Sequence, residues 1–173
     1  LIISIVNSRF DNLNDKGKID YDVALINKFS ITSKSDMFMI AGLIKENKIN
    51  EGLKSILTEL ERIKQNGFIE KELETYKKKY ISSGKQSLKA KKTRENNNHI
   101  DEISRNFLEN EFVIGEEREH ELSKKLFKTI TVDDLNEAFN QWFKYDDRLV
   151  NFRYPKKIIN KISKDDFLSI ENK

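Results

Sequence analysis

The spacing of apolar residues changes twice within the first 66 positions of this chain, and this change constrains the fold most. Residues 1–15 carry apolar side chains at spacings of three and four, the stripe of an amphipathic helix. Residues 21–32 alternate apolar and polar side chains, and 37–44 are apolar on both faces, so we expect two strands that pair as a hairpin. The helical spacing returns over 49–66, which ends at an Asn-Gly pair. The alternation assigns to the buried face of the first strand Tyr21, Val23, Leu25, Phe29 and Ile31.

Helical spacing continues through the middle of the chain. We expect helices over 68–92, 93–112 and 116–127. Thr131 and Asp134 resemble a capping box at the start of a further helix that reaches Trp142. The side chains expected to face the core are Leu73, Tyr76, Tyr80 and Leu88 in the first of these helices, Ile100, Ile103 and Phe107 with Phe112 in the second, and Leu122, Leu126 and Phe127 in the third.

The chain is expected to return to a strand only near its end. Residues 149–154 alternate like a strand and precede Pro155, the only proline. The order of elements predicts an α+β fold, with several helices layered on one face of a small, mostly antiparallel sheet. We expect this domain to span residues 1–155 and 156–173 to be a polar tail or interdomain linker. Because three strands make a small sheet, we also expect one or more strands before Leu1, so that the domain is truncated at its N-terminus.

Composition excludes several kinds of active site. The 173 residues include no Cys and only two His, at positions 99 and 120, which excludes thiolate zinc sites, Cys nucleophiles and paired His ligands on one helical turn. The glycines are isolated, so no phosphate-binding Gly-rich loop is present, and no Ser lies in a nucleophile-elbow pattern. No apolar run approaches the roughly 18 residues that cross a bilayer. We therefore expect neither a catalytic centre nor a metal or other cofactor within this chain.

An acid-free run of basic residues is the sharpest local charge feature. The stretch 75–94 contains no Asp or Glu, and its eight positive residues are Lys77, Lys78, Lys79, Lys85, Lys89, Lys91, Lys92 and Arg94. One interpretation is an anion-binding face for nucleic acid, with lysines on phosphates and bases on tyrosines. The other is the solvated back of a long helix. We favour the second, because Tyr76 and Tyr80 share the stripe of Leu73 rather than lying among the lysines.

The second charged feature is the pair Glu116 and His120, which stand one helical turn apart. Such a carboxylate and imidazole can meet a metal or polarise a water. A hydrolytic zinc usually has three protein ligands, and the local sequence supplies neither the second His nor another ligand. We favour an exposed, charged helix start. His99 is interpreted as a polar residue at a helix margin.

One longer stretch resembles a known family. Residues 51–77, with Gly67, Glu72 and Leu73 at the junction of two helices, resemble the helix–Gly–helix signature of the pitrilysin/insulinase family of zinc metallopeptidases, the inverted zincins. Upstream, Ser8-Arg9-Phe10, Gly17 and Tyr21 are similar to that family's helix, turn and strand start. Downstream, 130–135 is similar to its helix entry. The resemblance covers about residues 1–155 in collinear order.

The resemblance implies a role outside the zinc site. Members of the family have four related α/β domains in two halves that close around a peptide, and the first domain holds zinc through a His-x-x-Glu-His motif. That motif is absent from this sequence, which implies a domain other than the catalytic one. In the last domain of active members an Arg seven residues before a Tyr helps to hold the substrate. Tyr21 matches that Tyr, but Asn14 replaces the Arg, which favours the second domain or an inactive fourth.

The sequence thus predicts a non-catalytic structural and substrate-chamber domain of a zinc-dependent metalloendopeptidase that acts on peptides or unfolded polypeptides. Its expected partners are the other domains of the parent chain, which holds the zinc, and an extended peptide that adds to the sheet edge. Tyr21 is the candidate chamber contact, with a core aromatic as the alternative. We expect no membrane or nucleic-acid partner, and a free sheet edge would also allow two copies to pair. A cytoplasmic and a periplasmic location are both left open.

Two alternative functions remain. One is an inactive scaffold or assembly subunit with the same fold, which a parent chain without the His-x-x-Glu-His motif would indicate. The other is an independent basic nucleic-acid-binding domain that uses Lys77 to Arg94.

Overall fold

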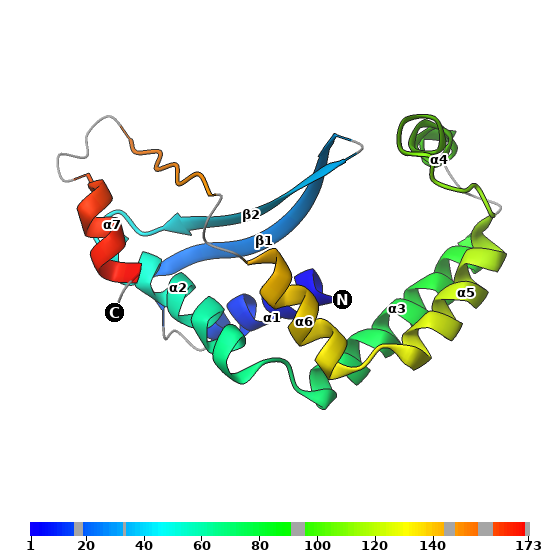
Figure 1. The fold of residues 1–173 in the computed structure, drawn as a ribbon, viewed down its shortest axis with the longest axis horizontal. Coiled ribbons are helices and arrows are strands. Elements are labelled where there is room, and N and C mark those ends of the chain that lie inside the picture. The colour runs from blue at the N-terminus through cyan, green and yellow to red at the C-terminus, as the bar shows by residue number, and fades with distance from the viewer. Residues whose placement is uncertain (16–18, 33, 91–95, 144–147, 156–160, 172–173) are drawn as a thin grey trace.

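The computed structural model describes residues 1–15, 19–32, 34–90, 96–143, 148–155 and 161–171. Figure 1 shows the elements in chain order. They are α1 (Ile2–Asp15), β1 (Tyr21–Thr32), β2 (Ser35–Ile44), α2 (Ile49–Asn66), α3 (Glu70–Ala90), α4 (Asn96–Glu109), α5 (Glu116–Thr129), α6 (Val132–Trp142) and α7 (Lys164–Glu171). Of the helices formed by these residues, none combines the length and the hydropathy that crossing a membrane requires.

The helices that form the core lie on one face of an antiparallel hairpin. Strand β1 pairs with β2, and α1, α2 and α6 lie below the hairpin in the view of Figure 1. The largest fully buried side chains lie between these layers: Ile5, Val6, Phe10, Tyr21, Ile26, Ile63, Leu73 and Phe139. The α+β class with helices on one face of the sheet is therefore confirmed. The sheet formed by the described residues has only these two strands.

A β-bulge changes which face of β1 is buried. The register shifts between Tyr21, which is opposite Ile44, and Val23, which is opposite Leu43. Because an extra residue reverses the alternation, the buried residues after Tyr21 are Ala24 and Ile26. The predicted buried face was wrong beyond Tyr21: 48% of Val23 is exposed, and Phe29 and Ile31 are also exposed.

The C-terminal part of the chain differs from the prediction in two ways. Residues 149–154 form no strand, and 92% of Leu149 is exposed. Within this segment Phe152 packs on Phe167 of α7, with ring centroids 6.1 Å apart. The stretch 156–173, expected to be a polar tail, contains helix α7, which contacts α2 and buries Phe167. Side-chain packing with α7, rather than strand pairing, therefore orders the described part of this region.

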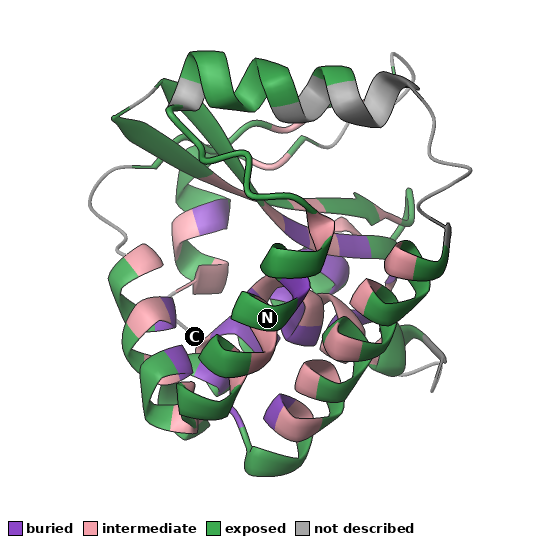
Figure 2. Ribbon diagram, turned by 90° about the vertical axis from the view of Figure 1, so that its right-hand side faces the viewer, coloured by how far each residue is buried: buried purple, intermediate pink, exposed green. Residues whose placement is uncertain are grey.

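The apolar stripes of α4 and α5 are mostly not buried. Helices α3 and α5 form an antiparallel arm that leaves the core, and α4 lies at its far end (Figure 1). The described part of α4 is accordingly exposed (Figure 2), as are Phe112, Leu122 and Leu126. Periodicity identified these helices correctly, but the expected burial was wrong because nothing among the described elements covers those faces.

Candidate functional site

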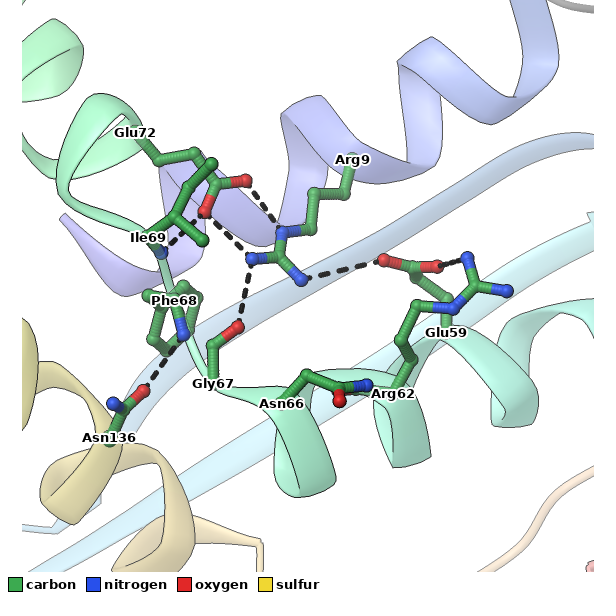
Figure 3. Close-up of polar contacts among 9 residues, drawn as sticks. All are labelled: Arg9, Glu59, Arg62, Asn66, Gly67, Phe68, Ile69, Glu72 and Asn136. Carbon is green, nitrogen blue, oxygen red and sulfur yellow. Dashed lines mark hydrogen bonds and ion pairs between the residues drawn. The ribbon is translucent and has the colours of Figure 1, made fainter.

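Two of the family-like signature positions, Gly67 and Glu72, meet at one polar cluster that joins α1, α2 and α3 (Figure 3). The guanidinium of Arg9 donates from Nε and Nη2 to the two carboxylate oxygens of Glu72, each over 2.7 Å, and from Nη2 to the carbonyl of Gly67 over 3.0 Å. Its Nη1 lies 3.7 Å from the buried carboxylate of Glu59. Arg9 thus binds three segments that are distant in sequence, and we name this group, Arg9, Glu59, Gly67 and Glu72, the Arg9 cluster.

The Arg9 cluster stabilises the ionised carboxylate of Glu72. Burial opposes this charge, but the hydrogen bonds from Arg9 and from the Ile69 amide, together with the charge of Arg9, lower the pKa of Glu72 below its usual value. Burial likewise opposes the charge of Arg9, and the hydrogen bond and charge of Glu72 with those of Glu59 raise the pKa of Arg9. Both partners therefore stay charged near neutral pH.

The turn between α2 and α3 depends on Gly67. This residue has φ of 69° and ψ of −166°, a conformation that only glycine adopts readily. Its Cα faces Asn136 of α6, whose Oδ1 would lie 2.6 Å from an added Cβ. The same Oδ1 accepts a hydrogen bond of 2.9 Å from the amide of Phe68. The third signature position, Leu73, is fully buried in the core, so the signature encodes a helix junction rather than a reactive group.

Tyr21 lies in the core and not on a surface that a peptide can reach. Only 1% of it is exposed, its ring packs edge-on against Phe10, and its hydroxyl donates to the Phe10 carbonyl over 3.1 Å. Burial, with the negative charges of Glu59 and Asp11, raises the pKa of Tyr21 to about 12. The chamber-contact interpretation is therefore corrected in favour of the core aromatic. Asn14, in place of the family's Arg, donates to the carbonyl of Asp22 over 2.8 Å.

Replacing Tyr21→Phe should lower the free energy of unfolding by only about 1 kcal/mol, because it removes one hydrogen bond while keeping the ring in the core. Urea unfolding at neutral pH measures the change. The variant should also lose less stability than the wild type above pH 10, where unfolding lets the buried phenol ionise. A parallel alkaline loss in both proteins would contradict this assignment.

The described part of the acid-free run lies on α3, where two of its lysines have partners and the others are exposed. The Lys77 ammonium lies 3.1 Å from Oε1 of Glu74, and the Lys79 ammonium lies 4.9 Å from the ring centroid of Tyr76. The remaining described members, Lys78, Lys85 and Lys89, are exposed. Lys91, Lys92 and Arg94 lie outside the described residues.

Glu116 and His120 lie on α5, where His120 is buried against α3. A Cβ added to Gly84 would lie 2.4 Å from His120 Nδ1, so glycine permits this close approach of the two helices. His120 Nε2 is buried and makes no hydrogen bond to a described residue. Within the described ranges, no three His, Cys, Asp or Glu side chains are grouped so as to hold a metal ion. The favoured prediction of an exposed helix start was therefore wrong for His120; the side chain of His99 is not described.

The two edges of the hairpin differ, a feature that the sequence did not reveal. Asn7 of α1 donates from Nδ2 to the carbonyl of Ile26 over 3.1 Å and accepts from the Ile26 amide over 2.7 Å. Asn7 therefore takes the place of a neighbouring strand at the outer edge of β1. No comparable hydrogen bond from a described residue reaches the outer edge of β2. A single Asn on a helix gives no periodic signal, which is why this contact could not be predicted.

The face of the hairpin opposite the helices is apolar. Val23 lies opposite Leu43 and Phe29 opposite Met37, and directly paired residues project from the same face. All four side chains are exposed. The free edge of β2 therefore borders an exposed apolar surface, the combination that an extended peptide with alternating side chains can use.

The chain matches known proteins by its fold but not by its sequence. No family model and no curated protein matches the chain. Among solved structures, the periplasmic protease PqqL from Escherichia coli matches with a TM-score of 0.83 at 18% identity, over 98% of this chain and 19% of PqqL. The structure of the first half of PqqL matches with 0.76 at 20% identity, over 81% of this chain and 30% of that one. A predicted insulinase family protease from Yersinia pestis matches with 0.78 at 14% identity, over 99% and 37%.

The chain has the fold of a domain of these proteases. Its length corresponds to well under half of each of them. The resemblance around Gly67, Glu72 and Leu73 is thus confirmed at the level of the fold. Within it, Gly67 and Glu72 belong to the Arg9 cluster, and Leu73 packs in the core.

Proposed function

We propose that this chain is a non-catalytic structural and substrate-chamber domain of a zinc-dependent metalloendopeptidase. The observation that carries the proposal is the fold, which matches almost the whole of this chain to about a fifth of PqqL. Because this sequence lacks the His-x-x-Glu-His motif, we assign it the packing and wall-forming role within such a protease. Asn14, in place of the Arg that active fourth domains carry, favours the second domain or an inactive fourth.

The chemistry of the side chains supports the non-catalytic role. Inverted zincins hold zinc with a His-x-x-Glu-His motif, and here the two histidines stand at 99 and 120 without that pattern. Activation of a water for peptide hydrolysis requires such a metal site or an equivalent base and nucleophile. The zinc is therefore assigned to another domain of the parent chain, whose substrates are peptides or unfolded polypeptides.

The chamber role is assigned to the free edge of β2. Both backbone groups of Ile26 bond to Asn7, so Ile26 belongs to a pair that exchanges no hydrogen bonds across the hairpin. Its partner Ile40 must then direct its own N–H and C=O away from β1. An extended peptide that pairs with these groups would lay alternate side chains on the apolar face near Met37 and Leu43.

The test is the substitution Ile40→Pro in the complete gene product, assayed for hydrolysis of an unfolded polypeptide. Proline removes the outward N–H without removing a β1–β2 hydrogen bond, so KM should rise about 5-fold to 10-fold, the effect of one lost hydrogen bond. Ile40→Val keeps the donor and should leave KM unchanged. An unchanged KM in a folded Ile40→Pro enzyme contradicts the edge assignment, whereas no hydrolysis by the unmodified product supports the scaffold alternative.

A further inference from the structure

Three lysines of α3 form a line along its solvent side. With 3.6 residues per turn, Lys78, Lys85 and Lys89 point within about 40° of one another around the helix axis. All three are exposed, and we name them the lysine ridge. The residues of α3 that contact α5 lie on another side: Tyr80 packs on Phe127, and Gly84 lies against His120.

The charges of the lysine ridge are not neutralised within the described structure. No described residue forms an ion pair or hydrogen bond with Lys78, Lys85 or Lys89. From 75 to 90 the helix carries no acid, so the ridge is a continuous positive strip. In contrast, Lys77 is paired with Glu74, and Lys79 lies over a tyrosine ring. Among the described members of the run, the ridge lysines are therefore those that remain available to a partner.

We propose that the lysine ridge binds acidic segments of extended polypeptides. The inference rests on the proposed function, because it takes the partner to be the polypeptide that the parent protease handles. Lys85 and Lys89 are separated by about 6 Å along the helix axis. Alternate side chains of an extended strand are separated by about 6.7 Å. The ammonium groups of Lys85 and Lys89 can therefore meet carboxylates two positions apart in such a segment. Lys78, about 10 Å from Lys85 along the axis, can meet a further carboxylate of the same segment.

The tyrosines of the same helix favour a polypeptide over a nucleic acid. Single-stranded nucleic acids bind to positive grooves in which aromatic side chains stack on the bases. Tyr76 is half-buried beneath Lys79, and Tyr80 packs on Phe127 and hydrogen-bonds Ser4 over 3.2 Å. Neither ring lies between the ridge lysines, where it could stack on a base. The ridge therefore offers a partner charge pairing only.

The test measures binding of a labelled oligoglutamate peptide to the 173-residue chain at low and moderate salt. The variant carries Lys78→Glu, Lys85→Glu and Lys89→Glu. The control carries Lys45→Glu, Lys54→Glu and Lys128→Glu, three exposed positions outside α3. Each triple change alters the net charge by −6, from +3 to −3, so general charge effects are equal. We expect the ridge variant to bind at least 10-fold more weakly than the control, and wild-type binding to weaken with salt.

Several outcomes would overturn the proposal. They are an equal loss in both triple variants, no measurable binding by the wild type at low salt, or tighter binding of duplex DNA or anionic vesicles through the same lysines. Circular dichroism checks the fold, and a triple Lys→Gln variant at the ridge positions, which should also bind more weakly than the control, replaces the Glu variant if that one unfolds. The effect of Ile40→Pro on KM is independent of this result, so either proposal can fail alone.

Discussion

The substitution Arg9→Met is expected to lower the free energy of unfolding by about 2 to 3 kcal/mol, because it removes one partner of a largely buried ion pair. Glu72 would lose both guanidinium hydrogen bonds, and the Gly67 carbonyl would lose its donor. The side chains of Arg9 and Glu72 are 16% and 23% exposed, so solvent reduces the effect below that of a fully buried pair. Urea unfolding with a two-state fit measures the difference.

Arg62→Met is the matched control for this prediction. Arg62 also bonds to Glu59, at 2.8 Å, but its side chain is 55% exposed. Exposed pairs contribute at most about 1 kcal/mol, so the control should lose little stability. If the two variants lose equal stability, the Arg9 cluster does not join the helices in the way that its geometry indicates.

The loss of stability caused by Arg9→Met should be smaller in acid than at neutral pH. The pKa of Glu72 is lower in the folded state than the unfolded value of 4.5, so its contribution is present above that value and is lost as pH falls through the folded pKa. The stability difference between wild type and Arg9→Met should therefore shrink below pH 4.5. A difference that stays constant into acid would contradict the ion pair as its source.

The substitution Gly67→Ala should destabilise the chain by about 3 kcal/mol. Two costs add: a non-glycine residue in this backbone region costs about 1 to 3 kcal/mol, and displacing Asn136 removes the hydrogen bond from the Phe68 amide. Because the new Cβ would lie 2.6 Å from Asn136 Oδ1, the amide of Asn136 must turn away, and its hydrogen bond with the Phe68 amide is lost. Thermal and urea unfolding both report it.

Gly115→Ala separates the two costs. Gly115 has φ of 78° and ψ of 148°, a similar backbone conformation, but an added Cβ would meet no atom within 4 Å. This control should show the backbone cost alone, about 1 to 2 kcal/mol. Equal losses at both glycines would mean that the contact with Asn136 has no energetic consequence.

Local patterns predicted the elements well because they report on local physics. The capping box at Thr131 is present: the Asp134 carboxylate accepts from the Thr131 amide over 2.7 Å, and the Thr131 hydroxyl accepts in return over 3.2 Å. The helix over 49–66 has the predicted limits. In each case the backbone hydrogen bonds and caps lie within a few residues of one another.

Features that depend on distant contacts could not be predicted. The bulge after Tyr21 leaves no mark on the alternation, so the buried face of β1 was assigned wrongly from Val23 onward. Residues 149–154 have a strand's pattern but no partner strand among the described residues. Arg9, Gly67 and Glu72 were each noted by resemblance, but the hydrogen bonds that join them depend on how three helices pack, which the sequence does not show.

We propose that the zinc and the chemistry lie outside these 173 residues, in another part of the parent protease. The most direct measurement is the zinc content of the purified complete gene product, and of this chain alone, with hydrolysis of an unfolded polypeptide assayed in parallel. We expect stoichiometric zinc and chelator-sensitive hydrolysis in the complete product, and neither in this chain. Stoichiometric zinc or hydrolysis in this chain alone, or their absence from the complete product, would contradict this assignment.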